Sequence, residues 1–189
     1  MFRRATASAL TAALALGAAA CGQESRSKDE TKATAASSEA LYVDTGGLTY
    51  QVQLSRQLNP RDAEDSDYFR NLPAGGVDLR KGQVWFGVFL RVENQTKQAL
   101  PSSREFTVTD TQGNVFRPLP NPNVFAYRPE LVPADGFIPN PERLQAYAGT
   151  QGELLLFKLP SVSLNNRPLE LAIKNPSDTR RSARIDLDV

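Results

Sequence analysis

Histidine is absent from this chain and cysteine occurs once among its 189 residues, which excludes the commonest catalytic and metal chemistries. Without histidine there is no imidazole general base, no Ser-His-Asp or Cys-His pair and no histidine ligand for zinc. A single cysteine cannot form an internal disulfide. Excess charge of one sign is also lacking, because 22 basic residues stand against 21 acidic ones. A nucleic-acid partner, which would call for a basic stripe or a strongly basic domain, is therefore not expected.

The first twenty residues have the plan of a signal peptide. A short basic head, Arg3 and Arg4, precedes an apolar stretch from Ala5 to Ala20 that is rich in alanine. This stretch is too short for a comfortable bilayer span, which needs about 20 residues. We therefore expect residues 1–20 to be a targeting segment that is removed on export.

Cys21 directly follows three alanines and precedes a polar tract. This order resembles the lipobox of bacterial lipoproteins, although Ala18 stands where that family usually has leucine. The resemblance implies that the Cys21 sulfur is acylated and that Cys21 becomes the new N-terminus, on the extracytoplasmic side of the cell membrane. The alternative is that Cys21 is an ordinary small packing residue, because free cysteine packs as a hydrophobe.

Residues 22–40 contain no valine, leucine, isoleucine or aromatic residue. Such a segment buries too little apolar surface to offset its ordering entropy. We therefore expect residues 21–40 to be a lipidated N-terminus followed by a flexible tether. The composition changes at Leu41, and residues 41–189 are long enough for one domain with one core.

Apolar residues in this domain recur with a period of two, which is typical of β-strands with one buried face. The alternating or apolar runs are residues 48–55, 84–93, 106–108, 115–116, 154–159, 169–173 and 183–189. Turn-forming residues separate the runs, and Asp110 to Asn114 predict a hairpin. About seven short strands of this kind predict an all-β fold, an antiparallel β-sandwich, with a closed barrel as the alternative.

From Trp85 onward, turn and packing residues follow one another in a fixed order: the turn Asn94-Gln95-Thr96, a strand from Phe106 to Asp110 followed by Gly113, the pair Gly149 and Gly152, and Leu156-Phe157 followed by Pro160. This order is similar to an immunoglobulin-like domain of bacterial surface lipoproteins of unknown function. The resemblance implies an immunoglobulin-like sandwich at the cell envelope, with an unspecified binding or structural role and no active site. A long proline-rich insertion before Gly149 departs from the pattern.

The densest acidic cluster lies within residues 60–70, where we also expect a short helical turn. Its members are Asp62, Glu64, Asp65 and Asp67. Several carboxylates on a loop could bind calcium, but the spacing does not fit an EF-hand. A helix capped by Asn59, with Pro60 at its first position, would explain the acids equally through the helix dipole. The sequence therefore assigns no metal ligand and no cofactor.

Seven of the 13 prolines fall between Pro118 and Pro141, interleaved with Phe125, Tyr127 and Phe137. A loop this long is uncommon inside a compact domain and is often functional. The three aromatic residues could form a recognition surface for a peptide, a glycan or a partner protein. Alternatively, the loop is an ordered cover with its rings against the core.

Together these patterns predict an exported, lipid-anchored envelope protein that acts as a non-catalytic binding or accessory module. Its expected partners are the membrane, through the anchor, and an envelope protein or glycan. An envelope hydrolase, a calcium-dependent adhesin module and a plain structural spacer remain as alternatives.

Overall fold

The computed structural model describes residues 35–36, 42–73, 76–148 and 150–187. The predicted signal peptide, Cys21 and most of the predicted tether lie outside the described residues. Within the described ranges, no helix has the length and apolar character needed to cross a membrane.

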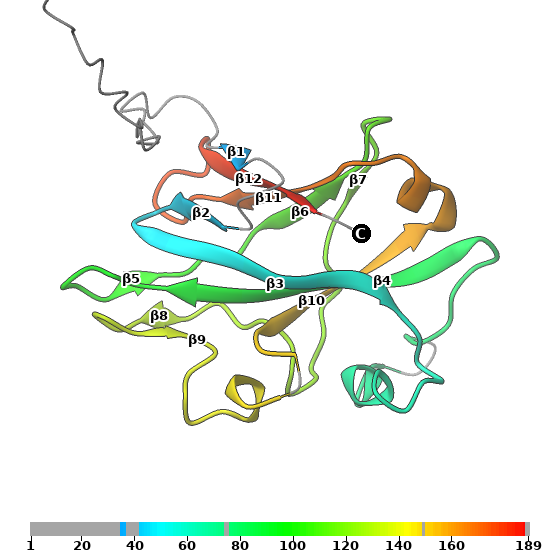
Figure 1. Cartoon of the computed structure of the whole chain (residues 1–189), viewed down its shortest axis with the longest axis horizontal. Coiled ribbons are helices and arrows are strands. Elements are labelled where there is room, and N and C mark those ends of the chain that lie inside the picture. Colours follow the sequence, from blue (N-terminus) through cyan, green and yellow to red (C-terminus); the bar gives the residue numbers. More distant parts are fainter. Residues whose placement is uncertain (1–34, 37–41, 74–75, 149, 188–189) are drawn as a thin grey trace, which may run out of the picture. The chain divides into compact units, whose positions relative to one another are not determined.

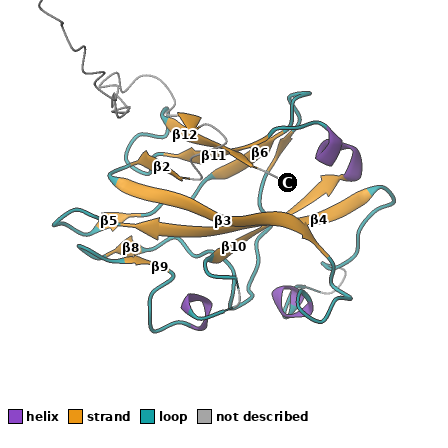
Figure 2. Ribbon diagram, viewed as in Figure 1, coloured by secondary structure: helices purple, strands orange, loops and turns teal. Residues whose placement is uncertain are grey.

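Two β-sheets form the two layers of the domain, and short 3-10 turns lie in the connections (Figures 1 and 2). Sheet A contains, in spatial order, β1 (Ala35–Ala36), β12 (Ser182–Leu187), β11 (Leu169–Lys174), β6 (Phe106–Thr109) and β7 (Val115–Phe116). Sheet B contains β10 (Glu153–Pro160), β4 (Gln83–Glu93), β3 (Leu48–Leu58) and β2 (Tyr42–Thr45), with β9 (Phe137–Ile138) at the end of β4. The remaining elements are the pair β5 (Leu100–Pro101) and β8 (Leu131–Val132), and the 3-10 turns η1 (Ser66–Phe69), η2 (Leu144–Ala146) and η3 (Ser161–Asn165).

The strand pairs are antiparallel except β1 with β12, so the predicted antiparallel β-sandwich is confirmed. The predicted hairpin also forms, since β6 pairs with β7 across the turn at Asp110. β1 lies inside the stretch that the sequence assigns to the tether. Its two residues extend sheet A beyond β12, so the paired part of the chain begins before Leu41.

The main core lies between the sheets and follows the period-two pattern. On β4 the even-numbered residues from Phe86 to Val92 point inward and are fully buried. They meet Leu171, Ile173 and Ile185 of sheet A, which are also fully buried. Because each strand of an antiparallel sandwich turns alternate residues to the core, the sequence periodicity predicted these residues correctly.

A β-bulge changes the facing of β3 midway along the strand. Val52 lies opposite Leu90, but Leu54, two residues later, lies opposite Phe89, the next residue of β4. The extra residue, Gln53, reverses which face the later side chains occupy. The period of two predicted for residues 48–55 would place Leu54 on the buried face of Val52, and this is wrong, since 36% of Leu54 is exposed.

A second core covers part of the outer side of sheet B. Trp85 and Phe89, on odd-numbered positions of β4, meet Leu154 and Leu156 of β10 there. Aromatic residues of the connections complete this core: Phe69 packs edge-on against Trp85, with ring centroids 5.2 Å apart, and Tyr68 packs edge-on against Phe89 at 5.1 Å. The Trp85 ring nitrogen donates a hydrogen bond to the Val77 carbonyl at 3.2 Å.

The region of residues 60–70 is helical only at its end. Turns occupy residues 60–65, and η1 begins at Ser66 after Asp65, whose side chain makes no capping hydrogen bond. The predicted short helical turn within residues 60–70 is therefore confirmed as η1, but it begins at Ser66, so Asn59 does not cap it and Pro60 is not its first residue. Instead, the Asn59 side chain accepts a hydrogen bond from the Arg61 amide at 3.0 Å, which forms a local turn.

Candidate functional site

The first part of the proline-rich segment runs along the edge strand β10. The Leu119 amide donates to the Leu156 carbonyl at 2.8 Å, and the Tyr127 amide donates to the Leu154 carbonyl at 2.9 Å. The Leu154 amide donates in turn to the Phe125 carbonyl at 2.8 Å. Edge strands expose unpaired backbone groups, so this pairing closes an edge of sheet B without a regular strand.

Two of the predicted aromatic residues pack into different cores. The Tyr127 ring lies edge-on to Phe106, with centroids 5.0 Å apart, and its hydroxyl donates to the Ser103 carbonyl at 3.0 Å. Burial raises the pKa of Tyr127 well above its ordinary value. Phe125 instead packs edge-on to Tyr68 in the second core, at 5.4 Å. Both residues act as parts of a cover.

Phe137 belongs to β9 and has a different environment. The guanidinium of Arg91 lies 4.3 Å from the centre of its ring, and Arg91 also forms an ion pair with Glu93 at 2.7 Å. Phe137 is half-buried beside Glu93, its register partner. The structure therefore places Phe125, Tyr127 and Phe137 in three packing environments rather than on one shared recognition surface.

A pocket of about 230 Å³ lies where the covering segment meets β6 and β10. We call it the cover pocket. Its walls are largely apolar and include Phe106, Tyr127, Pro118 and Pro120. The density of prolines in the sequence drew attention to this segment. It did not predict that the segment would pair with β10 and so form one wall of the pocket.

Two polar residues of the cover pocket were not foreseen from the sequence. The Asn121 side-chain nitrogen is shielded from solvent and has no hydrogen-bond partner among the described residues. Its side-chain oxygen accepts a hydrogen bond from the Asn123 amide at 3.0 Å, which fixes the orientation of the amide group. Arg104 also lines the pocket, is exposed, and forms no ion pair with any residue that the structure describes.

An ion-pair network attaches the second part of the proline-rich segment to β10. Arg143 pairs with Glu130 and, at 3.0 Å, with Glu153. The Glu153 side chain is fully buried and also accepts a hydrogen bond from the Arg128 amide at 2.9 Å. Burial raises the pKa of Glu153 despite these partners. Because a buried carboxylate needs such partners, the network holds this part of the cover in place.

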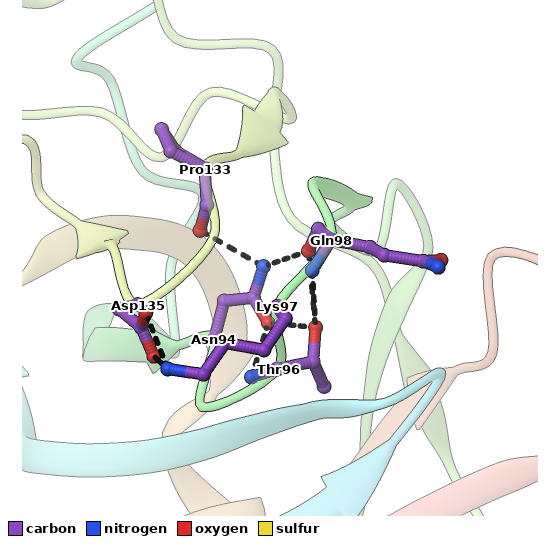
Figure 3. A network of polar contacts seen from close by, with 6 residues as sticks. All are labelled: Asn94, Thr96, Lys97, Gln98, Pro133 and Asp135. Carbon is purple, nitrogen blue, oxygen red and sulfur yellow. Dashed lines mark hydrogen bonds and ion pairs between the residues drawn. The ribbon is translucent and has the colours of Figure 1, made fainter.

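The turn Asn94-Gln95-Thr96 also joins the proline-rich segment to sheet B (Figure 3). Asn94 is 2% exposed, and its side-chain nitrogen donates to the backbone carbonyls of Gln98, Val132 and Pro133 at 2.7–3.0 Å. Its side-chain oxygen accepts hydrogen bonds from the amide and hydroxyl of Thr96. These contacts give Asn94 a structural role as a turn residue.

The acidic cluster is divided among local contacts. Asp65 pairs with Arg56 and accepts the Asn59 amide at 2.8 Å. Burial opposes ionisation of Asp65, but these partners outweigh it and lower its pKa. Asp67 pairs with Arg70 at 2.7 Å. Among the described residues, no group of three or more histidine, cysteine or acidic side chains is arranged to hold a metal ion.

Comparisons with known proteins identify no family for this chain. No family model and no curated protein matches the chain. Among solved structures, a candidate lipoprotein of Bacillus subtilis, ycdA, aligns with a TM-score of 0.47 and 11% identity over 79% of this chain, which spans 38% of ycdA. An uncharacterized β-sandwich protein of Clostridium difficile aligns with a TM-score of 0.44 and 9% identity, over 85% of this chain and 98% of that one. The yjhA protein of B. subtilis aligns with a TM-score of 0.48 and 11% identity, over 78% of this chain and 96% of that one.

Proposed function

We propose that this chain is an exported, lipid-anchored protein that works as a non-catalytic binding module on the extracytoplasmic side of the cell membrane, with an immunoglobulin-like sandwich as its folded part. The leader and the position of Cys21 support export and anchoring. One observation carries the binding role: a preformed apolar pocket with an unpartnered polar group lies beneath a firmly held cover.

The firmness of the cover favours binding because an ordered site loses little entropy when a ligand enters. Backbone hydrogen bonds hold one part of the cover along β10, and Arg143 holds the other part to Glu130 and Glu153. Prolines at positions 118, 120 and 129 further limit the backbone around the pocket. Ligand sites are commonly of this kind, concave and largely apolar with few polar groups.

The chemistry of the cover pocket favours binding over hydrolysis. Its polar side chains are an amide, a guanidinium and the phenol of Tyr127. The phenol donates to the Ser103 carbonyl and has a raised pKa, so it is a poor general base. Nucleophilic catalysis needs an activated nucleophile beside a base, and the residues that line this pocket supply neither.

Metabolic labelling with radioactive palmitate tests the anchor. We expect the wild-type protein to carry label and to sediment with membranes, whereas Cys21→Ser loses both. Cys21→Ser combined with Ser27→Cys is the matched control, because it restores a thiol at a position that does not follow the three alanines. Label retained by Cys21→Ser would contradict the anchor.

Site-specific photocrosslinking in intact cells tests the binding role. A benzophenone amino acid at position 120 lies in the cover pocket, whereas one at position 112 lies in the exposed turn between β6 and β7. We expect a discrete adduct from position 120 that position 112 does not give. The same adducts from both positions, or none from position 120, would count against the pocket as the binding site.

A further inference from the structure

The cover pocket contains hydrogen-bond donors without acceptors. The first is the side-chain nitrogen of Asn121, which is shielded from solvent and has no partner among the described residues. An unmade hydrogen bond at a buried donor costs about 1–3 kcal/mol. Because the Asn123 amide fixes the side-chain oxygen, rotation of the Asn121 amide group does not remove the problem. The Asn121 nitrogen is therefore a donor without an acceptor in the wall of the cover pocket.

A second donor comes from the edge of β10. Both backbone groups of Leu154 bond to the covering segment, so they point away from β4. In an antiparallel pair, the residue two positions along points its backbone groups to the same side. The Leu156 carbonyl does so and accepts from the Leu119 amide. The Leu156 N–H faces the same side, and the hydrogen bonds of the described residues include no acceptor for it.

Arg104 adds positive charge at the pocket. Its guanidinium is exposed and has no carboxylate within ion-pair distance among the described residues, although Glu105 is next in the chain. Arg104 also borders a second hollow of about 300 Å³, which Glu105 and Lys174 line. The cover pocket, by contrast, contains no acidic side chain, so an anion that enters it meets Arg104 without a competing carboxylate.

We propose that the cover pocket binds a small carboxylic acid with an apolar body. The carboxylate accepts hydrogen bonds from Asn121 and from the Leu156 N–H and pairs with Arg104. A carboxylate has about four acceptor sites, and hydrogen bonds from charged donors are roughly twice as strong as neutral ones. The rings of Phe106 and Tyr127 contact the apolar body. This inference rests on the proposed binding role and adds the class of ligand to it.

The size of the pocket limits the body of the acid. A volume of about 230 Å³ is below the roughly 300–1,000 Å³ of pockets that hold drug-sized ligands. This suits a single ring with a short acid chain. Phenylacetate is therefore a suitable probe, and phenylacetamide is its neutral twin of nearly the same shape.

Titration of the full-length, ¹⁵N-labelled protein in a non-ionic detergent, followed by NMR, tests the inference. We expect phenylacetate to bind at least about tenfold more tightly than phenylacetamide, because a hydrogen bond to a charged group contributes about 1.5–3 kcal/mol. The Asn121 side-chain amide and the Leu156 backbone amide are expected to show the largest shifts.

Two substitutions locate the charge recognition. Arg104→Gln should remove most of the preference for the acid and leave the affinity for the amide unchanged. Arg117→Gln is the matched control, because Arg117 is also exposed and without an ion pair among the described residues but does not line the pocket. Asn121→Asp keeps the oxygen that bonds Asn123 and replaces the donor by a second acceptor, so it should abolish binding of the acid.

Each result decides between distinct claims. Equal affinity for the twins, or the same loss in Arg104→Gln and Arg117→Gln, overturns the carboxylate class and leaves the binding role standing. Shifts centred away from Asn121 and Leu156 overturn the pocket as the site. If neither twin binds, the inference fails, while the crosslink from position 120 still decides the proposed binding role and the palmitate label still decides the anchor.

Discussion

The main core and the second core of this domain are built by different means. Between the sheets, regular strands supply nearly all the buried residues, each turning alternate side chains inward. On the outer side of sheet B, strand residues such as Trp85 and Phe89 meet Tyr68, Phe69 and Phe125 from irregular connections. The first core depends on pairing between strands, and the second depends on how loops fold over a finished sheet.

This difference indicates where stability and function lie. The main core joins both sheets, so its loss unfolds the domain. The second core holds the loops that carry the cover pocket, so its loss should release the cover before the sandwich unfolds. Substitutions in each core should therefore separate global from local opening.

Phe157→Ala should have the largest effect, because Phe157 is fully buried in the main core. We expect the free energy of unfolding to fall by about 4 kcal/mol, the usual cost of removing a buried phenylalanine ring. Denaturant unfolding measures it, and Val162→Ala serves as the control because 59% of Val162 is exposed. A loss below about 2 kcal/mol would show that the main core is less tightly packed than described.

Phe125→Ala should cost about 2 kcal/mol, because the ring is only partly buried and its edge-on contact with Tyr68 adds a modest term. The opening should be local. Hydrogen exchange should quicken at the Leu154 and Tyr127 amides, which hold the cover to β10, and not in β11. Val124→Ala is the matched control, since the neighbouring side chain is exposed. An equal increase in the hydrogen-exchange rate throughout both sheets would show that the two cores open as one cooperative unit.

Gly87→Ala tests how readily the second core yields. A Cβ at position 87 would lie 2.7 Å from a terminal carbon of Leu58 and 3.0 Å from one of Leu154. Both are flexible ends of side chains in the second core, so we expect a loss of about 1 kcal/mol. Gly152→Ala should cost more, because φ is +122° there and the Cβ would meet the backbone of Leu90. Thermal unfolding compares the two variants. A larger loss of stability in Gly87→Ala than in Gly152→Ala would contradict the expectation that side chains of the second core move to admit a methyl group.

The sequence predicts the main core well and the second core poorly for the same reason. Alternation identifies β3, β4 and β11, because one face of each strand must be apolar, and an almost unbroken apolar run identifies β10. Strands of two residues, such as β5 and β9, are too short to show a period. The bulge at Gln53 breaks the alternation of β3, and nothing in the neighbouring residues announces it.

The candidate site could be predicted only in outline. The prolines and aromatic residues drew attention to the segment that lines the cover pocket, but they did not predict that Phe125 and Tyr127 would pack into different cores. Arg104 and Asn121 have no local pattern, since they meet only because the cover pairs with β10. Contacts of this kind depend on the tertiary fold, which a period in the sequence does not encode.

Asp110→Asn tests the rim of the main core through pH, because Asp110 lies in the turn between β6 and β7. Asp110 is 4% exposed and accepts hydrogen bonds from the Gln112 and Asn114 amides at 3.0 Å each. Burial alone would raise the pKa of Asp110, but hydrogen bonds, among them those from Asn114 and Asn166, outweigh it and lower the pKa from 3.8 to about 2.

A lowered pKa means that the folded state favours the ionised carboxylate. Its contribution to stability is therefore present above pH 3.8 and is lost as the pH falls toward about 2. Denaturant unfolding at pH 7, 4 and 2.5 should show a smaller acid loss in Asp110→Asn than in the wild type. Asp186→Asn is the control, because Asp186 lies on β12, opposite Glu170 of β11 in the strand register, and outside this turn. If the free energy of unfolding falls by the same amount in the wild type and in Asp110→Asn as the pH is lowered, the turn at the rim is not coupled to the main core.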